Sequence, residues 1–314
     1  MSEHGMNAIR VLLDTDANNE IDDQHAIAYL LLSGDSFILE GITVNKTNNG
    51  GDIHEQAKEA ERVIKLCDME DKISVTLGAS DSFSEIQSKV MNPVFDGSDA
   101  VDLMIEKAHR NASQILTILA IGKLTNVALA IKKDPTIVSK IKVVWLGSNY
   151  PLPGEYNLES DSESMNFVIA SGVLFEIAVV RYKEKSGTTA VTVTPENLIK
   201  NIVGNGPKLD KAVIGRNGGE FFNFGDYSFN LLDNVYLFGD PPSRPLYDMA
   251  AVAIIKNPEW AEKKEIPSML YKDGAWHAEP DLVTNLYIYE DFDKEKILED
   301  FFSSVKNYIK VAVS

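Results

Sequence analysis

Five acidic side chains stand within ten positions near the start of the sequence: Asp14, Asp16, Glu20, Asp22 and Asp23. Like charges this close repel one another, and an ordinary turn between a strand and a helix does not require them. Carboxylate oxygens are the ligands that Ca²⁺ and Mg²⁺ prefer in proteins. The cluster therefore predicts a site for a hard divalent cation at the end of the strand-like segment 9–14.

Two other interpretations of this cluster start from the same residues. Asp22 and Asp23 also belong to the residue types that cap the first turn of a helix, and this reading stays open. An EF-hand would use positions 14, 16, 18, 20 and 22, but Asn19 occupies the position of its required glycine and His25 that of its bidentate glutamate. Because the preceding segment is also strand-like, we exclude an EF-hand.

The segments that would position the cluster alternate between strands and helices. Continuous apolar runs predict strands at 9–14, 37–45, 73–79, 115–122 and 141–147. Amphipathic or apolar-periodic segments predict helices at 22–34, 52–67, 99–110 and 124–135. Strands of this kind, separated by helices, indicate an α/β fold with a doubly wound, mostly parallel sheet flanked by helices. Ligands of such sheets bind at the carboxyl ends of the strands, where the cluster lies.

The second half of the sequence is less regular. Segment 181–246 is rich in Gly, Asn and aromatic residues, and it predicts a loop or helical insertion of the kind that often covers an active site. Residues 246–260 return to a helical pattern, and 268–280 predict a small β-hairpin that turns at 272–275. We find neither repeats nor a linker, and we therefore expect a single domain over residues 1–314.

Charge and cysteine content restrict the possible partners. The chain carries 47 acidic and 30 basic residues, a formal charge of −17, without a cluster of Lys and Arg, so a nucleic-acid polymer is excluded as a partner. Cys67 is the single cysteine, which leaves no intrachain disulfide. No segment reaches the length of a membrane span, and residues 1–10 lack the pattern of a signal peptide. We expect a cytoplasmic protein with no membrane partner.

Asp14-Thr15-Asp16 at a strand end, followed by Asp22-Asp23 at a helix start, resembles the signature of the calcium-dependent nucleoside hydrolases of the inosine-uridine preferring type. In the usual motif the second and third Asp lie closer together. The loop here is longer by two residues, which indicates a variant branch of the family. Four later segments resemble the family in order: GITVNKTN, LAIGKLTNVALAIKKDP, WLGSNYPLPGEYNLESD and LYDMAAVA.

The resemblance implies a nucleoside hydrolase-like fold and hydrolysis of the N-glycosidic bond of a (ribo)nucleoside, with Ca²⁺ as the cofactor. The metal ligands that it implies are Asp16, Asp22, Asp23, the carbonyl of Ile121, and Asp248. The sugar contacts that it implies are Asn48, Asn149, Glu155 and Asn157. Asp16 would be the general base for a metal-bound water, whereas Asp14 would orient the loop. The implied partners are a small nucleoside and further copies of the chain, in a dimer or tetramer.

The sequence departs from the family at the leaving group. Many members carry a His before the last metal Asp, and here that position is Tyr247, which becomes the candidate catalytic residue for the departing base. A phenol, with a reference pKa of about 10, is a weaker proton donor than imidazole. Tyr227 and Tyr236 are further candidates for base contact, whereas His25 is expected on a helix face and His277 at the surface. The nucleobase and the choice between ribose and deoxyribose stay open.

Two other functions compete with this interpretation. A sugar- or nucleoside-binding protein of the same fold could have lost turnover, because a fold does not define a function. Asp-x-Asp after a first strand also opens a class of metal-dependent phosphohydrolases. That class needs cationic and hydroxyl side chains for phosphate, and the segment DANNEIDD supplies none.

Overall fold

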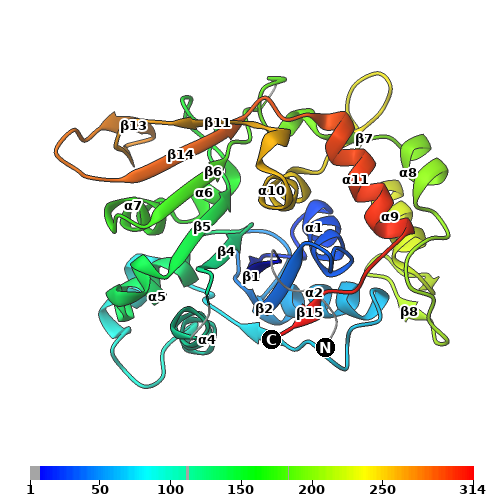
Figure 1. The fold of residues 1–314 in the computed structure, drawn as a ribbon, viewed down its shortest axis with the longest axis horizontal. Helices are drawn as coiled ribbons and strands as arrows, with labels where there is room; N and C mark the ends of the chain where they lie inside the picture. The colour runs from blue at the N-terminus through cyan, green and yellow to red at the C-terminus, as the bar shows by residue number, and fades with distance from the viewer. Residues whose placement is uncertain (1–7, 111–112, 183) are drawn as a thin grey trace.

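A computed structural model describes residues 8–110, 113–182 and 184–314 of the chain. Within these residues the largest sheet has nine strands in the order β11-β14-β6-β5-β4-β1-β2-β15, with β3 also paired to β2 (Figure 1). All neighbours are parallel except β11 and β14. The strands are β1 (Ile9–Thr15), β2 (Phe37–Val44), β3 (Val75–Leu77), β4 (Leu116–Ala120), β5 (Ile141–Leu146), β6 (Leu174–Ala178), β11 (Glu262–Glu265), β14 (Asn285–Glu290) and β15 (Ala312–Val313).

The strand order places a topological switch beside β1. From β1 the chain moves through β2 to β3 in one direction, and β4, β5 and β6 then follow on the other side of β1. Two neighbouring connections leave the sheet on opposite faces at such a point, which opens a crevice at the carboxyl ends of the strands. The predicted doubly wound, mostly parallel sheet is confirmed, and the acidic cluster at the end of β1 lies at its switch.

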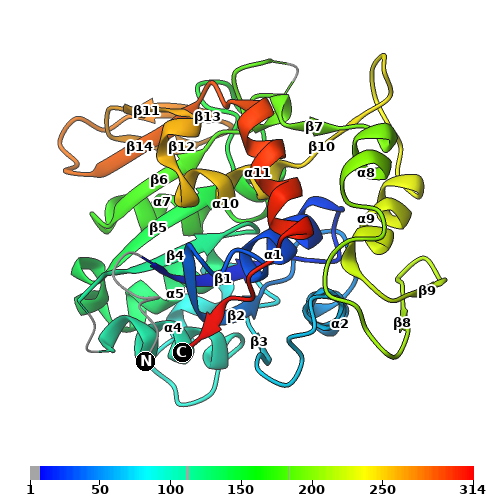
Figure 2. The same cartoon turned by 45° about the vertical axis from the view of Figure 1, so that its right-hand side comes forward.

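Helices cover both faces of this sheet (Figures 1 and 2). One layer contains α1 (Asp22–Leu31), α2 (Ile53–Leu66), α10 (Tyr247–Lys256) and α11 (Lys294–Lys306). The other contains α3 (Phe83–Ile86), α4 (Ser98–His109), α5 (Thr125–Lys133) and α7 (Ser162–Ala170). Strand β1 contributes side chains to the hydrophobic core on each face of the sheet. Val11 and Leu13 pack with the first helix layer, and Leu12 packs with the second. This two-sided burial explains why the strands are apolar runs without alternation.

The insertion at 181–246 is folded but has little regular structure. It contains the helices α8 (Pro195–Asn201) and α9 (Phe224–Asp233), a 3₁₀ turn η3 (Thr188–Ala190), and four two-residue strands, β7 (Thr192–Val193), β8 (Val213–Ile214), β9 (Glu220–Phe221) and β10 (Arg244–Pro245). Strand β7 pairs with β10, and β8 with β9, both antiparallel. The predicted helical and loop insertion is therefore present.

The small hairpin is formed by β12 (Met269–Lys272) and β13 (Ala275–Ala278), as the sequence predicts. Its two central turn residues, Asp273 and Gly274, have φ values of 51° and 73°, which match the right-handed twist of the strands they join. The remaining elements are α6 (Tyr156–Ser160), η1 (Gln87–Lys89), η2 (Pro135–Ser139) and η4 (Pro258–Trp260).

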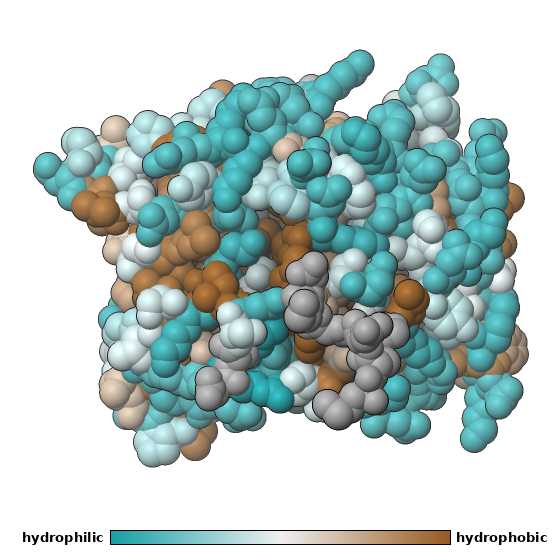
Figure 3. Space-filling view, viewed as in Figure 1, coloured by the Kyte–Doolittle hydropathy of each residue, from teal (hydrophilic) through white to brown (hydrophobic). Residues whose placement is uncertain are grey.

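The surface agrees with the acidic composition. On the face shown in Figure 3, hydrophilic residues predominate and apolar residues form small separate patches. Among the described residues, no helix combines the length and the apolar character that crossing a membrane requires.

Candidate active site

A cavity of about 830 Å³ opens at the carboxyl ends of the central strands. It is bounded by the loop after β1, the residues that follow β4, β5 and β6, the starts of α1 and α10, and part of the insertion. Its walls include the side chains Asp16, Asn19, Glu20, Asp22, Asp23, Asn49, Ile121, Glu155, Tyr156, Asn157, Tyr182, Phe238, Arg244, Tyr247 and Asp248. The cavity therefore joins the predicted metal ligands to residues of the insertion.

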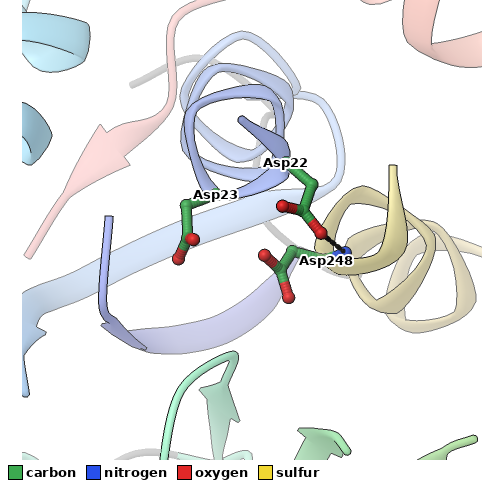
Figure 4. A group of neighbouring side chains, drawn as sticks. All are labelled: Asp22, Asp23 and Asp248. Carbon is green, nitrogen blue, oxygen red and sulfur yellow. Dashed lines mark hydrogen bonds between the residues drawn. The ribbon is translucent and has the colours of Figure 1, made fainter. Parts of the chain in front are cut away.

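Three carboxyl groups form the acidic floor of the cavity. Asp22 and Asp23 open α1 and Asp248 lies in the first turn of α10, and the three groups surround one small space (Figure 4). Each offers one oxygen such that the three oxygens lie within 4.8 Å of one another, and the amide of Asp248 donates to Oδ2 of Asp22 over 3.3 Å. The N-cap of α1 is Ile21, without a side-chain capping bond, so helix capping does not account for the acidic pair.

The buried, mutually repelling carboxyl groups of the floor favour the binding of a cation. Burial, helped by neighbouring carboxylates, raises the pKa of Asp22 to about 6 and those of Asp23 and Asp248 well above their usual range. Oδ1 of Asp248 is buried and has no hydrogen-bond partner. Desolvated like charges and an unpaired carboxylate oxygen are costly without a counter-charge. An all-oxygen donor set of this kind fits a hard divalent ion.

Asp16 lies beside this floor, at the end of β1. Its Oδ2 accepts hydrogen bonds from the hydroxyl of Thr47 and from Nδ2 of Asn19, the latter over 3.3 Å. Burial raises the pKa of Asp16 to about 7, and the charges of Asp22 and Asp14 add to this effect. A carboxylate with this pKa can accept a proton near neutral pH.

Asp14 faces away from the cavity and orders the strand ends. Its carboxylate accepts from Thr43 Oγ1 over 2.6 Å, from Asn126 Nδ2 over 2.8 Å and from Asn45 Nδ2 over 3.0 Å. These donors come from β2, α5 and the residue after β2, so Asp14 ties together the elements on both sides of β1. The geometry agrees with the expected orienting role.

Ile121 and Asn157 meet at the end of β4. The carbonyl of Ile121 accepts from Nδ2 of Asn157 over 3.1 Å, and the same amide donates to the carbonyl of Leu146 over 3.1 Å. Glu155 caps α6 and accepts three backbone N–H groups over 2.8–2.9 Å. Burial nevertheless raises its pKa to about 6. All three residues line the cavity.

Two of the expected sugar contacts lie elsewhere. Asn48 is exposed and does not line the cavity. Asn49 does line it, and its backbone N–H donates to the hydroxyl of Tyr156 over 2.7 Å, which holds residue 49 at the mouth of the cavity. Asn149 is also absent from the walls. Both ends of its side-chain amide are engaged, with Oδ1 accepting from the amide of Tyr182 over 2.9 Å and Nδ2 donating to the carbonyl of Pro153 over 3.2 Å. Its structural task is therefore to hold Tyr182.

Aromatic side chains and one arginine form a second part of the cavity lining, the aromatic wall. The rings of Tyr182 and Tyr247 meet edge to face, with centroids 6.2 Å apart. Burial raises the pKa of Tyr247 to about 12, so its phenol stays protonated at neutral pH. Phe238 and Arg244 complete this wall. Sequence reasoning missed Tyr182, Phe238 and Arg244, because the only signal was the aromatic richness of segment 181–246.

The other candidate tyrosines do not reach this wall. Tyr227 is fully buried, and its hydroxyl donates to Glu59 of α2 over 2.5 Å. Tyr236 is 75% exposed and does not line the cavity. Neither residue is placed to contact a base bound there.

No histidine of the described residues lines the cavity. His25 is buried within α1, 2.6 Å from the carbonyl of Ile21 and 2.7 Å from Oγ of Ser228, and burial lowers its pKa to about 4. His54, His109 and His277 are exposed, and His4 lies outside the described residues. The described lining of the cavity therefore offers no imidazole.

Comparison with known proteins identifies relatives that include nucleosidases and nucleoside hydrolases. The model of the family described as inosine-uridine preferring nucleoside hydrolase matches residues 11–299. A probable uridine nucleosidase of Oryza sativa subsp. japonica is 35% identical over 109 residues, which are 32% of this chain and 32% of that protein. An inosine-uridine preferring nucleoside hydrolase of Leishmania major is 33% identical over 79 residues, 23% of this chain and 25% of that protein. The aligned stretches thus span a third or less of these two relatives.

Solved structures share the fold over nearly their full length. A purine-preferring ribonucleoside hydrolase from Gardnerella vaginalis superposes with a TM-score of 0.73 at 20% identity, covering 94% of this chain and 98% of that chain. A plant nucleoside hydrolase superposes with a TM-score of 0.70 at 19% identity, covering 95% and 99%. At these identities the likeness establishes the fold, and the acidic cavity described above lies at its switch point.

Proposed function

The chain belongs to the inosine-uridine preferring nucleoside hydrolase family, a family of N-glycosyl hydrolases, and we propose that it hydrolyses the N-glycosidic bond of a (ribo)nucleoside to free base and ribose. The observation that carries this proposal is the meeting of Asp16, Asp22, Asp23 and Asp248 in one cavity at the switch of the sheet. The same cavity is large enough for a small-molecule substrate, since such sites commonly measure a few hundred to about 1,000 Å³.

We propose Ca²⁺ as the resident ion. Its ligands would be Asp16, Asp22, Asp23, Asp248 and the carbonyl of Ile121. The all-oxygen donor set, the unpaired Oδ1 of Asp248 and the raised pKa values of the buried carboxyl groups support this assignment. When bound, the ion would lower the pKa of a water and hold sugar hydroxyls.

Asp16 is the proposed general base. Thr47 and Asn19 hold its Oδ2, which fixes the carboxylate at the edge of the cavity. From there it accepts the proton of the attacking water as the bond between the sugar and the base breaks. The surrounding carboxylates favour the positive charge that develops on the sugar in an oxocarbenium-like state.

The proposed sugar contacts are Asn49, Glu155 and Asn157. All three line the cavity next to the acidic floor, and amide and carboxylate groups can distinguish donor from acceptor hydroxyls. Asn49 replaces Asn48 in this assignment, and Asn149 becomes a residue that positions Tyr182. Tyr247 is the proposed donor of a hydrogen bond to the departing base.

The test is turnover of uridine, inosine, adenosine and cytidine by the purified protein, with Ca²⁺ and with a chelator. We expect equimolar free base and ribose, loss of activity in chelator, and recovery when Ca²⁺ is returned. Nucleoside binding without release of ribose would instead support the non-catalytic binding protein. Phosphate release from a generic ester would favour a phosphohydrolase, for which the cavity offers only Arg244 as a cation among its described lining residues.

The assembly and location are also proposals. Met91 and Val94 are apolar, lie in one short turn and are 75% and 81% exposed, as expected of side chains that a second subunit covers in a homo-oligomer, a dimer or tetramer. Sedimentation analysis of the purified protein would give the number of subunits. The single buried thiol, Cys67, is compatible with the cytoplasm.

A further inference from the structure

The two places where this chain departs from the family pattern meet in the structure. Glu20 belongs to the lengthened loop between Asp16 and Asp22, and Arg244 lies three residues before Tyr247. Their side chains form an ion pair, and both residues line the cavity. The longer acidic loop thus supplies a carboxylate that reaches the wall where an imidazole is missing.

Within this pair, Arg244 is the enclosed partner. Its side chain is 13% exposed, against 44% for Glu20. Nη1 donates to the carbonyl of Tyr236 over 3.2 Å, and the guanidinium lies 5.2 Å from the centroid of the Phe238 ring. These contacts use two of the three guanidinium nitrogens, and no hydrogen bond of Nε–H is found among the described residues. Donor groups of Arg244 therefore stay available.

Glu20 offsets only part of the positive charge that Arg244 presents to the cavity. Water reaches the half-exposed carboxylate of Glu20 and screens it, whereas the enclosed guanidinium acts through a medium of lower polarity. Arg244 is the only basic side chain among the described residues that line the cavity, and its charge acts on the phenol of Tyr247.

A positive charge near the departing base would assist its departure. When the glycosidic bond breaks, its electron pair stays on the ring nitrogen, so the base leaves as an anion unless a proton is supplied. A guanidinium does not give up its proton, but its fixed positive charge and N–H groups stabilise an anion. Donors aimed at a developing charge each contribute about 10²–10³-fold in rate.

We propose that Arg244, held in place by Glu20, is a catalytic residue that stabilises the departing nucleobase as an anion. The inference rests on the proposed nucleoside hydrolysis. In the step, the oxygen of water bonds to the anomeric carbon, and the proton of that water moves to Asp16. The bond from that carbon to the base breaks, and its electron pair stays on the base beside Arg244. The released base takes a proton from solvent. Asp16 then gives the proton that it accepted back to solvent.

The experiment compares Arg244→Gln with the parent protein on uridine and on p-nitrophenyl riboside, whose leaving group already delocalises its charge. We expect a loss in kcat of about 10²-fold on uridine and of less than tenfold on p-nitrophenyl riboside. Arg244→Lys, which keeps the charge but not the fork of donors, should recover part of the loss. Glu20→Gln should show a smaller loss with the same preference between substrates, because Glu20 only positions Arg244.

Arg110→Gln is the matched control, since Arg110 pairs with Glu40 away from the cavity and its loss should change neither rate. Thermal unfolding and calcium titration of Arg244→Gln establish that the fold and the ion site survive. Equal losses on both substrates, or no loss on either, would overturn the role of Arg244 while nucleoside hydrolysis stands. A parent protein that hydrolyses neither substrate would instead refute the proposed function, and this inference with it.

Discussion

The floor of the cavity and its aromatic wall are built largely from different parts of the chain. The floor comes from the first turns of α1 and α10, two helices that are mostly buried, and Asp16 lies beside it just after β1. Most of the wall comes from Tyr182, Phe238 and Arg244, which belong to an insertion held by two-residue strands and single hydrogen bonds. Tyr247 joins it from the first turn of α10. The difference separates two tasks. Under the proposed function, the central sheet and its helices would fix the groups for metal and water, and the irregular segment would carry the contacts to the leaving base.

The largest effect should come from Asp16, beside the floor. Asp16→Asn removes the proposed acceptor of the proton and weakens a metal ligand, so kcat on uridine should fall by about 10³-fold. Steady-state rates at saturating Ca²⁺ measure the change. Asp210→Asn, an exposed aspartate of the insertion, is the matched control and should keep the parent rate. Parent-like turnover by Asp16→Asn would remove Asp16 from the role of base.

Without the metal, repulsion among the carboxylates of the floor should make the free energy of unfolding depend on pH. The folded-state pKa values of Asp16 and Asp22, about 7 and about 6, lie above the usual 3.8, so the folded protein binds protons that the unfolded chain has lost. In chelator, the free energy of unfolding should therefore decrease as pH rises from about 4 to about 7, by up to about 1.4 kcal/mol per pH unit for each group. Denaturant titrations between pH 4 and pH 8 measure this slope.

Bound Ca²⁺ should remove most of this decrease in the free energy of unfolding. An ion present at 100 times its Kd adds about 2.7 kcal/mol to the free energy of unfolding. Asp248→Asn serves as the comparison, because it deletes one of the like charges. In chelator at pH 7.5 this variant should be more stable than the parent, and Ca²⁺ should stabilise it less. Identical pH slopes with and without Ca²⁺ would show that the floor does not bind the ion.

The same contrast explains what the sequence could predict. Asp16, Asp22, Asp23 and Asp248 stand at strand ends and helix starts, where residue type and order already indicate position. The sequence did not indicate that Asn49 rather than Asn48 lines the cavity, because the loop after β2 continues into Gly50 and Gly51, which both have positive φ and follow no periodic pattern. Tyr182 and Arg244 reach the cavity only through contacts distant in sequence, which no local signal encodes.

A smaller effect is expected at the wall, for Tyr247. Tyr247→Phe removes a hydrogen-bond donor to the base but keeps the ring that packs against Tyr182. We expect kcat on uridine to fall by about 10–10²-fold, and far less on p-nitrophenyl riboside, whose leaving group needs no proton. Equal losses on the two substrates would favour packing or base stacking over donation.

The smallest effect should follow from Asn149, which separates positioning from sugar contact. Asn149→Ala removes the acceptor that holds the amide of Tyr182, a neutral hydrogen bond worth about 1 kcal/mol, so KM for uridine should rise about fivefold with little change in kcat. Asn149→Asp keeps that acceptor and should recover most of the affinity. If Asn149 instead touched the sugar, both variants would lower kcat on every riboside. The double variant with Tyr182→Ala decides between the two, because a positioning residue adds nothing once Tyr182 is gone.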